Sequence, residues 1–456
     1  MRTLLTAVTV GLLGAATAAA QTPDSTRARA RADSIRLVQE RRMLDSLGAV
    51  IRALQARMDS LGRMGGERGV TQEGQPSQSQ QAPPARASGA YMNIGFDGLG
   101  DFGWSTEPNV GLLQRGDHDP LVRGFTIPNA EISLDGAVDP YFKGFANIVY
   151  KLDTSGETGV ELEEAYFLTT SLRWNLQLKG GQFLTEFGRQ NAQHPHAWSS
   201  VDQPLVLNRM FGPDGLRSQG ARLSWLVPTR WYTEAMVSVL NSAGGTTSSF
   251  RSDESAEIHG GVPVTREVRR LGDLLVVPRI AISVDLTDTQ TLLFGASAAF
   301  GPNNSGPEAR TQIYGADLYW KWKSATAAAG FPFVSWQTET LFRRYDAAAR
   351  VSVEDQAPLP GERLNDRGVY SQVLWGIKPR IVAGLRFDLV GGSDAAFDSE
   401  LRARRSRLSP NLTWYPTEFS KLRLQYNLDN RKGVGTDHSL WLQFEFILGA
   451  HAAHKF

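Results

Sequence analysis

Apolar and polar residues alternate strictly along the last part of the chain. From residue 440 the even positions are almost all apolar, and they are Leu440, Leu442, Phe444, Phe446, Leu448, Ala450, Ala452, His454 and Phe456. The odd positions, from Trp441 through Gln443 and Glu445, are mixed. Such alternation predicts a β-strand whose two faces meet different environments. A soluble sheet edge this apolar would invite aggregation, whereas a strand between lipid and water satisfies the pattern.

Similar alternating segments, separated by turn residues, follow one another from Ala90 onward. About sixteen of them are near or above the roughly ten residues that a tilted strand needs to cross a membrane. The expected strands are 90–104, 121–135, 140–153, 158–171, 173–184, 219–227, 230–241, 276–286, 289–300, 310–322, 330–345, 367–377, 380–390, 403–415, 419–429 and 438–450. We therefore predict an all-β fold, a transmembrane antiparallel β-barrel of about sixteen strands over residues 89–456.

The predicted connections differ in length from one end of the strands to the other. Those after the even-numbered strands are short, for example 228–229 and 378–379. Three of the others are long: 185–218, 242–275 and 346–366. Short turns on one rim and long loops on the other are typical of an outer-membrane barrel.

Charged residues lie on the strand face opposite to the apolar residues. In segment 421–429, four apolar or aromatic residues alternate with Lys421, Arg423, Gln425, Asn427 and Asp429. An interior that carries so many charges needs water, so we expect a hydrated lumen. A barrel of about sixteen strands is wide enough to leave an aqueous channel.

Inward charges of opposite sign are predicted on different parts of the barrel. Basic residues gather on the late strands: Arg343, Arg386, Arg405, Arg407, Lys421 and Arg423. Acidic residues occupy early strands, namely Glu131, Glu161 and Glu163, and Glu339 and Glu445 also face inward. Two walls of opposite sign would create a transverse field that orients dipolar solutes in the pore. The alternative is that these residues form structural salt bridges inside the barrel.

Three segments precede the predicted barrel. Residues 1–20 have the pattern of a secretory signal peptide, with Arg2, a short apolar core and an A-x-A site before Gln21. Residues 25–62 carry a heptad repeat and predict a short periplasmic α-helical coiled coil that needs an oligomer for stability. An amphipathic helix lying on the barrel or the membrane is the alternative. Residues 63–88, rich in Gln, Pro and Ser, predict a flexible linker.

The composition excludes several classes of protein. Cysteine is absent, which excludes disulfides and thiolate metal sites. The formal net charge of +1 provides no basic field for nucleic acid, so no nucleic-acid partner is expected. The sequence has no phosphate-binding glycine loop, nucleophile elbow or HExxH helix, so we expect no enzyme activity and no cofactor.

The connection 185–218 contains the candidate pore residues. They are His194, His196, Trp198, Asp202 and Arg209. A loop of this length without secondary structure is usually functional or disordered, and its Trp, Phe, Leu and Pro content argues against disorder. We expect the loop to fold into the barrel and narrow the pore. A lid over the extracellular mouth is the alternative.

Two histidine pairs are candidate metal ligands. In an extended segment His194 and His196 would point to one side and form half of a site for Zn²⁺ or Cu²⁺, with Asp202 or another loop supplying further ligands. The alternative is that they form hydrogen bonds that hold the loop. His451 and His454 lie three residues apart, and such residues point to opposite faces of a strand. A shared metal there would require the tail to leave the sheet; otherwise both are interfacial residues.

Two sets of motifs resemble known outer-membrane families. PYFKGFANIVYKLDTSGETGVELEEAYFLTTSL at 140–172 and KGGQFLTEF at 179–187 resemble the early barrel of the phosphate-selective porin group. That resemblance implies a trimeric sixteen-stranded porin with a long inward loop. QNAQHPHAWSSVDQP at 190–204, LRLQYNLD at 422–429 and LWLQFEFILGAHAAHKF at 440–456 are more similar to outer-membrane proteins sometimes labelled zinc-regulated TonB-dependent receptors.

These features favour a passive channel for small hydrophilic solutes or ions in a Gram-negative type of outer membrane, with the N-terminal helix in the periplasm. The expected partners are membrane lipid, further copies in a homotrimer, and the barrel-assembly machinery, which would recognise the C-terminal strand ending in Phe456. The coiled coil is a candidate tether to the cell wall. The alternative function is zinc binding or uptake through His194 and His196.

Overall fold

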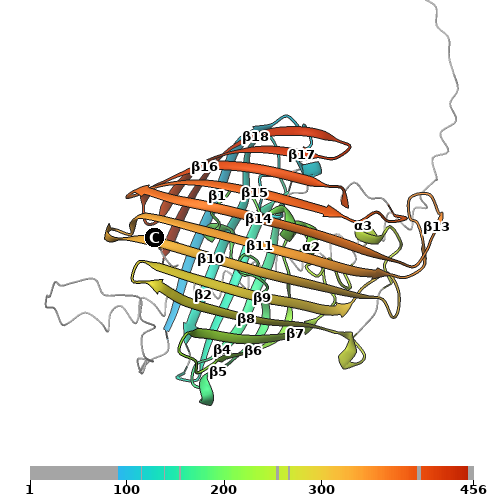
Figure 1. Cartoon of the computed structure of the whole chain (residues 1–456), viewed down its shortest axis with the longest axis horizontal. Helices are drawn as coiled ribbons and strands as arrows, with labels where there is room; N and C mark the ends of the chain where they lie inside the picture. The colour runs from blue at the N-terminus through green and yellow to red at the C-terminus, as the bar shows by residue number, and fades with distance from the viewer. Residues whose placement is uncertain are drawn as a thin grey trace, which may run out of the picture. The chain divides into compact units, whose positions relative to one another are not determined.

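The computed structural model describes residues 91–113, 116–137, 139–153, 156–252, 256–264, 268–397 and 402–449. Within these residues sixteen strands follow one another around a closed antiparallel barrel (Figure 1). They are β1 (Tyr91–Ser105), β2 (Gly124–Ala137), β3 (Phe142–Leu152), β4 (Thr158–Thr169), β5 (Leu176–Leu184), β6 (Arg217–Leu226), β7 (Tyr232–Asn241), β8 (Leu274–Thr287), β9 (Gln290–Pro302), β10 (Arg310–Ala328), β11 (Phe331–Ala347), β14 (Glu362–Lys378), β15 (Ile381–Gly392), β16 (Arg405–Thr417), β17 (Ser420–Arg431) and β18 (Gly435–Gly449).

Short elements occupy the connections between these strands. They are β12 (Arg350–Val351) and β13 (Pro358–Leu359), which pair with each other, helices α2 (Leu205–Phe211) and α3 (Ala256–His259), and 3-10 turns at Val110–Leu113, Arg173–Asn175, Pro195–Ala197 and Leu271–Asp273. None of the helices in the described residues has the length and apolar character needed to cross a membrane.

The predicted number and order of strands are confirmed. Each predicted range overlaps a strand of the barrel, and β18 closes the barrel against β1, with Phe96 paired to Leu448. The largest differences in length are at β10, which continues to Ala328, and at β14, which begins at Glu362. The predicted signal peptide, coiled coil and linker lie outside the described residues, as do His451, His454 and Phe456.

The alternation along β18 matches the two faces of the barrel wall. Leu442 is 41% exposed, whereas its neighbour Gln443 is 2% exposed. The same contrast holds on β15, where Leu385 and Phe387 are exposed and Arg386 between them is buried. Because successive side chains of a strand point to opposite faces, the apolar set covers the outside of the barrel and the polar set fills its inside.

The connections divide between the two rims as expected. Tight turns join β8 to β9, β10 to β11, β14 to β15 and β16 to β17. At the β10–β11 turn both Ala329 and Gly330 have positive φ, at 50° and 88°, as a tight hairpin that follows the twist of its strands requires. The long connections 185–216 and 242–273 leave from the opposite ends of strands.

The interior differs from the predicted water-filled lumen, because helix α2 lies inside the barrel (Figure 1). Leu205, Val206, Leu207 and Met210 are completely buried. They pack in one apolar cluster with inward residues of the wall: Phe183, Leu240, Leu275, Val277, Ala299, Ile313, Leu341, Tyr370 and Val390. The apolar run that begins after Pro204 therefore forms a hydrophobic core inside the barrel, and the prediction of a fully hydrated lumen is corrected.

Candidate functional site

The connection between β5 and β6, residues 185–216, crosses the inside of the barrel. Its backbone N–H groups donate to inward side chains of distant strands. These hydrogen bonds are Gly188 N to Ser297 Oγ of β9 at 3.1 Å, Gln190 N to Glu339 Oε1 of β11 at 2.7 Å, Val201 N to Gln425 Oε1 of β17 at 3.0 Å and Leu205 N to Asp388 Oδ1 of β15 at 3.0 Å. The loop thus lies within the lumen, and we refer to residues 185–216 as the inner loop.

Basic side chains of β15 and β17 bind carbonyl oxygens of alternate residues in the inner loop. The hydrogen bonds are Lys421 Nζ to His196 O at 2.6 Å, Arg423 Nη2 to Trp198 O at 2.9 Å, Arg423 Nη1 to Ser200 O at 3.0 Å and Arg386 Nη1 to Asp202 O at 2.7 Å. Three of the predicted lumen charges therefore hold the loop.

Asp202 is the main acidic anchor of the inner loop. Its Oδ1 lies 2.7 Å from Arg386 Nη2, and its Oδ2 lies 2.7 Å from Arg407 Nη1. Gln425 and Asn427 each donate a further hydrogen bond to this carboxylate, both at 2.9 Å. Burial alone would favour the neutral acid, but the two guanidinium groups outweigh it and lower the pKa of Asp202 to about 2. The carboxylate is consequently charged at neutral pH.

The other predicted lumen charges also have partners of opposite charge or loop carbonyls. The ion pairs are Arg343 with Asp366, Arg405 and Arg407 with Asp429, Lys421 with Glu445, and Glu161 with Arg217 and Lys151. Buried charges need such partners because their desolvation is costly. As predicted, most of the basic residues lie on β15 to β17 and the acidic ones on β2 to β4. These charges are paired inside the barrel with groups of opposite charge. Arg209, on α2, donates to Ala403 O at 3.3 Å.

His194 and His196 turn toward β2 and β4. Their rings stack with centroids 5.7 Å apart, and they contact Glu131 of β2 and Glu163 and Glu164 of β4. Burial disfavours charge on His194, but Glu163 and Glu164 outweigh it and raise its pKa above the usual value. Asp202, the predicted further ligand, is paired with the arginines of β15 and β16, and the acidic residues beside the histidines are Glu131, Glu163 and Glu164.

A second acidic cluster lies near the long-loop ends of β3 and β4. Asp117, Glu161 and Asp214 surround Lys151, whose Nζ lies 2.7 Å from Glu161 Oε2 and 3.4 Å from Asp214 Oδ1. Burial acts against ionisation of Asp117, yet Lys151 lowers its pKa to about 2. Burial, together with the Asp117 charge, raises the pKa of Asp214 to about 6. The ammonium group of Lys151 therefore already occupies the centre of this acidic cluster.

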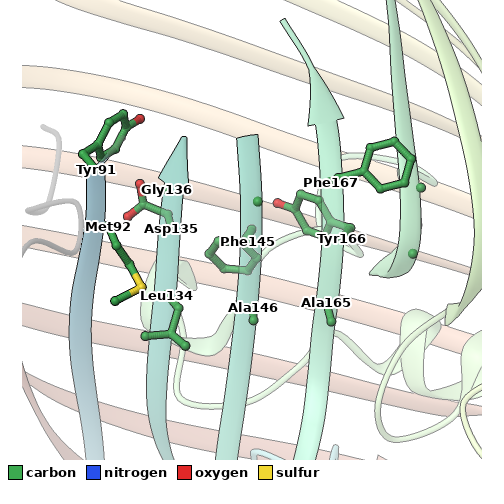
Figure 2. Close-up of a pocket in the computed structure, with 13 residues that line it drawn as sticks. Tyr91, Met92, Leu134, Asp135, Gly136, Phe145, Ala146, Ala165, Tyr166 and Phe167 are labelled. Carbon is green, nitrogen blue, oxygen red and sulfur yellow. The ribbon is translucent and has the colours of Figure 1, made fainter. Parts of the chain in front are cut away.

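A cavity of about 390 Å³ borders the inner loop. Its lining includes His196 and Trp198 of the loop, and Arg189, Lys321 and Lys421 as charged groups. A separate hollow of about 640 Å³ runs along β1 to β5 and is lined by Met92, Leu134, Phe145, Phe167 and several glycines (Figure 2). That hollow gathers no set of converging polar groups, so the candidate site is the inner loop with its cavity.

Several contacts of the site are not predicted by the sequence. Asp388 and Asp429 pair with the predicted arginines, and Asn147 and Glu164 lie beside His194. Strict alternation would have pointed either Glu163 or Glu164 into lipid, so the adjacent pair was a signal for a β-bulge. The contacts of the loop itself depend on which strands it reaches inside the barrel, and sequence spacing does not encode that.

Comparison with known proteins supports the fold. No family model matches the chain. It is 32% identical over 357 residues to an uncharacterised protein of Aquifex aeolicus (strain VF5). The aligned region covers 73% of this chain and 70% of that protein. The outer membrane channel DcaP of Acinetobacter baumannii has a TM-score of 0.50 at 14% identity, with 79% of this chain and 98% of that chain covered. The trimer form of OmpT from Vibrio cholerae has a TM-score of 0.46 at 7% identity, with 79% and 99% covered.

The expected porin-like sixteen-stranded barrel is thus confirmed as a fold. Structural likeness at such low identity says nothing about solute or partners. The resemblances to the phosphate-selective porin group and to zinc-regulated receptors stay predictions.

Proposed function

We propose that this chain, which belongs to the same protein family as its Aquifex aeolicus relative, is an outer-membrane channel for passive diffusion of small hydrophilic solutes or ions. The closed barrel and the structural likeness to an outer membrane channel support this proposal. The solute must be small, because the inner loop and α2 occupy much of the interior and the cavity beside the loop measures about 390 Å³.

The outward side chains support a position in a lipid bilayer. Large apolar residues are exposed on strand after strand, among them Trp336, Val373, Trp375, Leu385, Phe387, Leu412, Trp414, Leu424, Leu442 and Phe444. Soluble proteins rarely leave so extended an apolar surface in water. A band of this kind around a barrel is the lipid-facing surface of outer-membrane proteins.

The observation that carries the proposal is the way in which the inner loop is held across the barrel. Arg386, Arg407 and Arg423 bind its backbone and the Asp202 carboxylate on one wall. The two histidines bind acidic residues of β2 and β4, and the start of the loop donates to Ser297 of β9 and Glu339 of β11 across the barrel. A segment attached at both sides of a lumen narrows the path through it, and polar groups along that path select by size and charge.

Planar-bilayer recording of the purified full-length chain tests the proposal. We expect discrete ion-conducting steps of small amplitude, and swelling of proteoliposomes in small but not large uncharged sugars. Bilayers exposed to detergent alone provide the control. Protein that inserts as a folded barrel but neither conducts ions nor admits solutes would remove the channel from consideration.

Assembly is a separate part of the proposal. We infer a homotrimer whose periplasmic coiled coil, residues 25–62, stabilises the assembly and serves as a tether to the cell wall, and a C-terminal strand ending in Phe456 that the assembly machinery recognises. Native mass spectrometry of the full chain and of a variant without residues 25–62 tests the first point. Trimers that dissociate more readily in the variant are expected, and monomers in both samples would contradict it.

A further inference from the structure

Five side chains from three segments of the chain converge where the inner loop meets the early strands. His194 Nδ1 lies 3.0 Å from Glu163 Oε2 and 3.8 Å from Glu131 Oε2. His196 Nδ1 lies 3.0 Å from the other oxygen of Glu131. His194 Nε2 lies 2.8 Å from Glu164 Oε2. Imidazole nitrogens and carboxylate oxygens are the donors that divalent transition metals such as Zn²⁺ use in proteins that lack cysteine.

A β-bulge on β4 creates the acidic half of this cluster. Asn147 of β3 pairs with Glu164, but the next residue, Ile148, pairs with Leu162, so that Glu163 is the extra residue. Side chains of consecutive strand residues normally point to opposite faces, and a bulge re-aims one of them. Here both Glu163 and Glu164 are 5% exposed and face inward. Bulges often occur beside functional sites, where they direct a side chain.

The spacing of the donor atoms fits a metal ion. In a tetrahedral zinc site with metal–ligand distances of about 2.0–2.1 Å, the ligand atoms lie roughly 3.3–3.4 Å apart. The separations of 3.0 and 3.8 Å from His194 Nδ1 to the two carboxylates bracket that value, and the three donor atoms all lie within 4.8 Å of one another. Small side-chain shifts would equalise these distances.

Glu164 supplies the outer hydrogen bond that metal-binding histidines commonly make. It accepts from His194 Nε2 at 2.8 Å and so leaves Nδ1 directed at Glu131 and Glu163. Such a carboxylate fixes the ring orientation and increases the basicity of the ligating nitrogen. His196, through Glu131 Oε1, performs a similar task for the carboxylate ligand.

Asn147 occupies the centre of the cluster and is completely buried. Its Nδ2 lies 2.9 Å from Glu163 Oε2, 3.2 Å from His194 Nδ1 and 3.3 Å from Glu131 Oε2. An amide nitrogen carries two protons and cannot donate to three acceptors at once. Its Oδ1 has no hydrogen-bond partner among the described residues. A half-turn of the amide would present that oxygen to a cation as a fourth donor.

The acidic side chains of the cluster have histidines as their nearest basic partners, among them His118, whose Nε2 lies 3.4 Å from Glu163 Oε1. Asp97 of β1 pairs with Glu131 across the strands, and neither of its buried carboxylate oxygens has a hydrogen-bond partner in the described part of the chain. By contrast, the acidic cluster of Asp117, Glu161 and Asp214 surrounds Lys151. No lysine or arginine occupies the corresponding position between Glu131 and Glu163 in the described residues.

We propose that Glu131, Glu163 and His194 bind one divalent transition-metal ion, with Asn147 as a fourth donor and Glu164 and His196 orienting the ligands. His196 lines the cavity beside the inner loop, so the site borders the solvent-accessible interior. The ion joins the inner loop to β2 and β4, while arginines of β15 and β16 hold Asp202. The proposal depends on the position of the inner loop and not on conduction through the barrel.

Metal binding by the purified full chain tests the proposal directly. The protein is treated with chelator, exchanged into metal-free buffer and titrated with ZnCl₂. Isothermal titration calorimetry measures the affinity, and elemental analysis of the desalted protein measures the zinc bound per chain. We expect one tightly bound Zn²⁺ per chain, and at least tenfold weaker binding for Glu163→Gln and for His194→Gln. Unchanged affinity in both variants, or no bound Zn²⁺ on the folded wild type, would overturn the proposal.

Matched controls separate this site from other histidines and acids. His438→Gln, an exposed histidine that contacts Tyr426, and Asp214→Asn in the Lys151 cluster should keep full affinity. The double variant His451→Gln/His454→Gln should also bind one ion, and loss of the ion there would refute the assignment. Each variant is first checked for folding by gel electrophoresis, in which a folded barrel changes its mobility when it is heated. Binding is measured in detergent, so this result and the bilayer result can fail independently.

Hydrogen exchange shows whether the ion acts on the inner loop. Zn²⁺ should slow amide exchange in residues 190–204 of the wild type and leave exchange in the Glu163→Gln variant unchanged. Equal exchange with and without Zn²⁺ in the wild type would contradict binding at the inner loop.

Discussion

Asp202 of the inner loop and Arg407 of β16 form an ion pair inside the barrel, with Oδ2 and Nη1 2.7 Å apart. Arg407 also binds Asp429, so the pair belongs to a network that ties the loop to the wall. The network lies in a buried environment, where an unpaired charge is far more costly than a paired one. The position of the loop therefore depends on a few side chains, and each can be tested.

Replacement of Asp202 should release the inner loop. Asp202→Asn leaves Arg386 and Arg407 without their shared carboxylate, and removal of one partner of a buried ion pair costs about 3–5 kcal/mol. We expect a lower thermal unfolding midpoint and faster hydrogen exchange in residues 196–205. Asp346→Asn is the matched control, since its pair with Arg363 is exposed and worth only about 0–1 kcal/mol. Equal effects of the two substitutions would argue against the anchoring role.

Helix α2 should contribute substantially to stability. Met210 is completely buried in the apolar cluster, and truncation of such a residue to alanine costs about 2–5 kcal/mol. Met210→Ala should therefore lower the unfolding midpoint, whereas Val262→Ala, at a residue 69% exposed, should change it little. Denaturant titration followed by tryptophan fluorescence measures both. A neutral Met210→Ala variant would show that α2 is not packed inside the barrel in solution.

Acid should lower the stability of the connection between β7 and β8, which contains His259. Gly261 N donates to its Nδ1 at 3.1 Å, Arg350 lies beside it and Tyr345 stacks on it. Burial, and then the Arg350 charge, lower the pKa of His259 to about 4. The pKa of His259 in the folded protein is below its value of about 6.5 in the unfolded chain, so the neutral imidazole stabilises the fold. This contribution to the free energy of unfolding is fully present above pH 6.5 and is lost as pH falls through 4.

The expected size of this effect is on the order of 3 kcal/mol, from roughly 1.4 kcal/mol per pKa unit. Unfolding midpoints of the wild type and of His259→Gln, measured from pH 7 to pH 4, isolate it. The wild type should lose stability relative to the variant over that interval. Parallel curves would mean that His259 does not change its charge in this range.

The cavity beside the inner loop should favour anions. Its lining contains Arg189, Lys321 and Lys421 but no carboxylate. Arg189 lies over the Tyr319 ring at 4.0 Å, and Lys321 lies over Phe333 at 5.1 Å, so both are held in place by aromatic rings. In a KCl gradient the reversal potential should indicate anion preference, and Arg189→Gln/Lys321→Gln should reduce it. Cation preference in the wild type would contradict this account of the cavity.

The barrel could be predicted from sequence because each strand carries its own alternation. Leu442 faces outward and Gln443 faces inward because neighbouring residues of a strand point to opposite sides, and this contrast repeats along the strands. The turn at Ala329 and Gly330 is equally local. The inner loop also could be singled out by its length and composition.

The contents of the lumen could not be predicted in the same way. The basic residues on β15 to β17 are identifiable from the sequence, but the pairing of Arg386 and Arg407 with Asp202 is not, because the inner loop and these strands meet only after the barrel closes. The bulge that brings Glu163 and Glu164 together depends on pairing with β3. The apolar segment Leu205–Phe211 indicates a buried core, which a fully water-filled interior could not provide.

Single-channel conductance with and without the inner loop tests the central claim most directly. A full-length variant in which residues 189–214 are replaced by a short Gly-Ser linker is compared with the wild type and with Asp202→Asn in the same planar bilayers, after folding is verified. The account predicts that the loop-shortened barrel conducts several-fold more than the wild type, with Asp202→Asn in between. Equal conductance of all three, or no conductance from the loop-shortened barrel, would contradict a channel constricted by this loop.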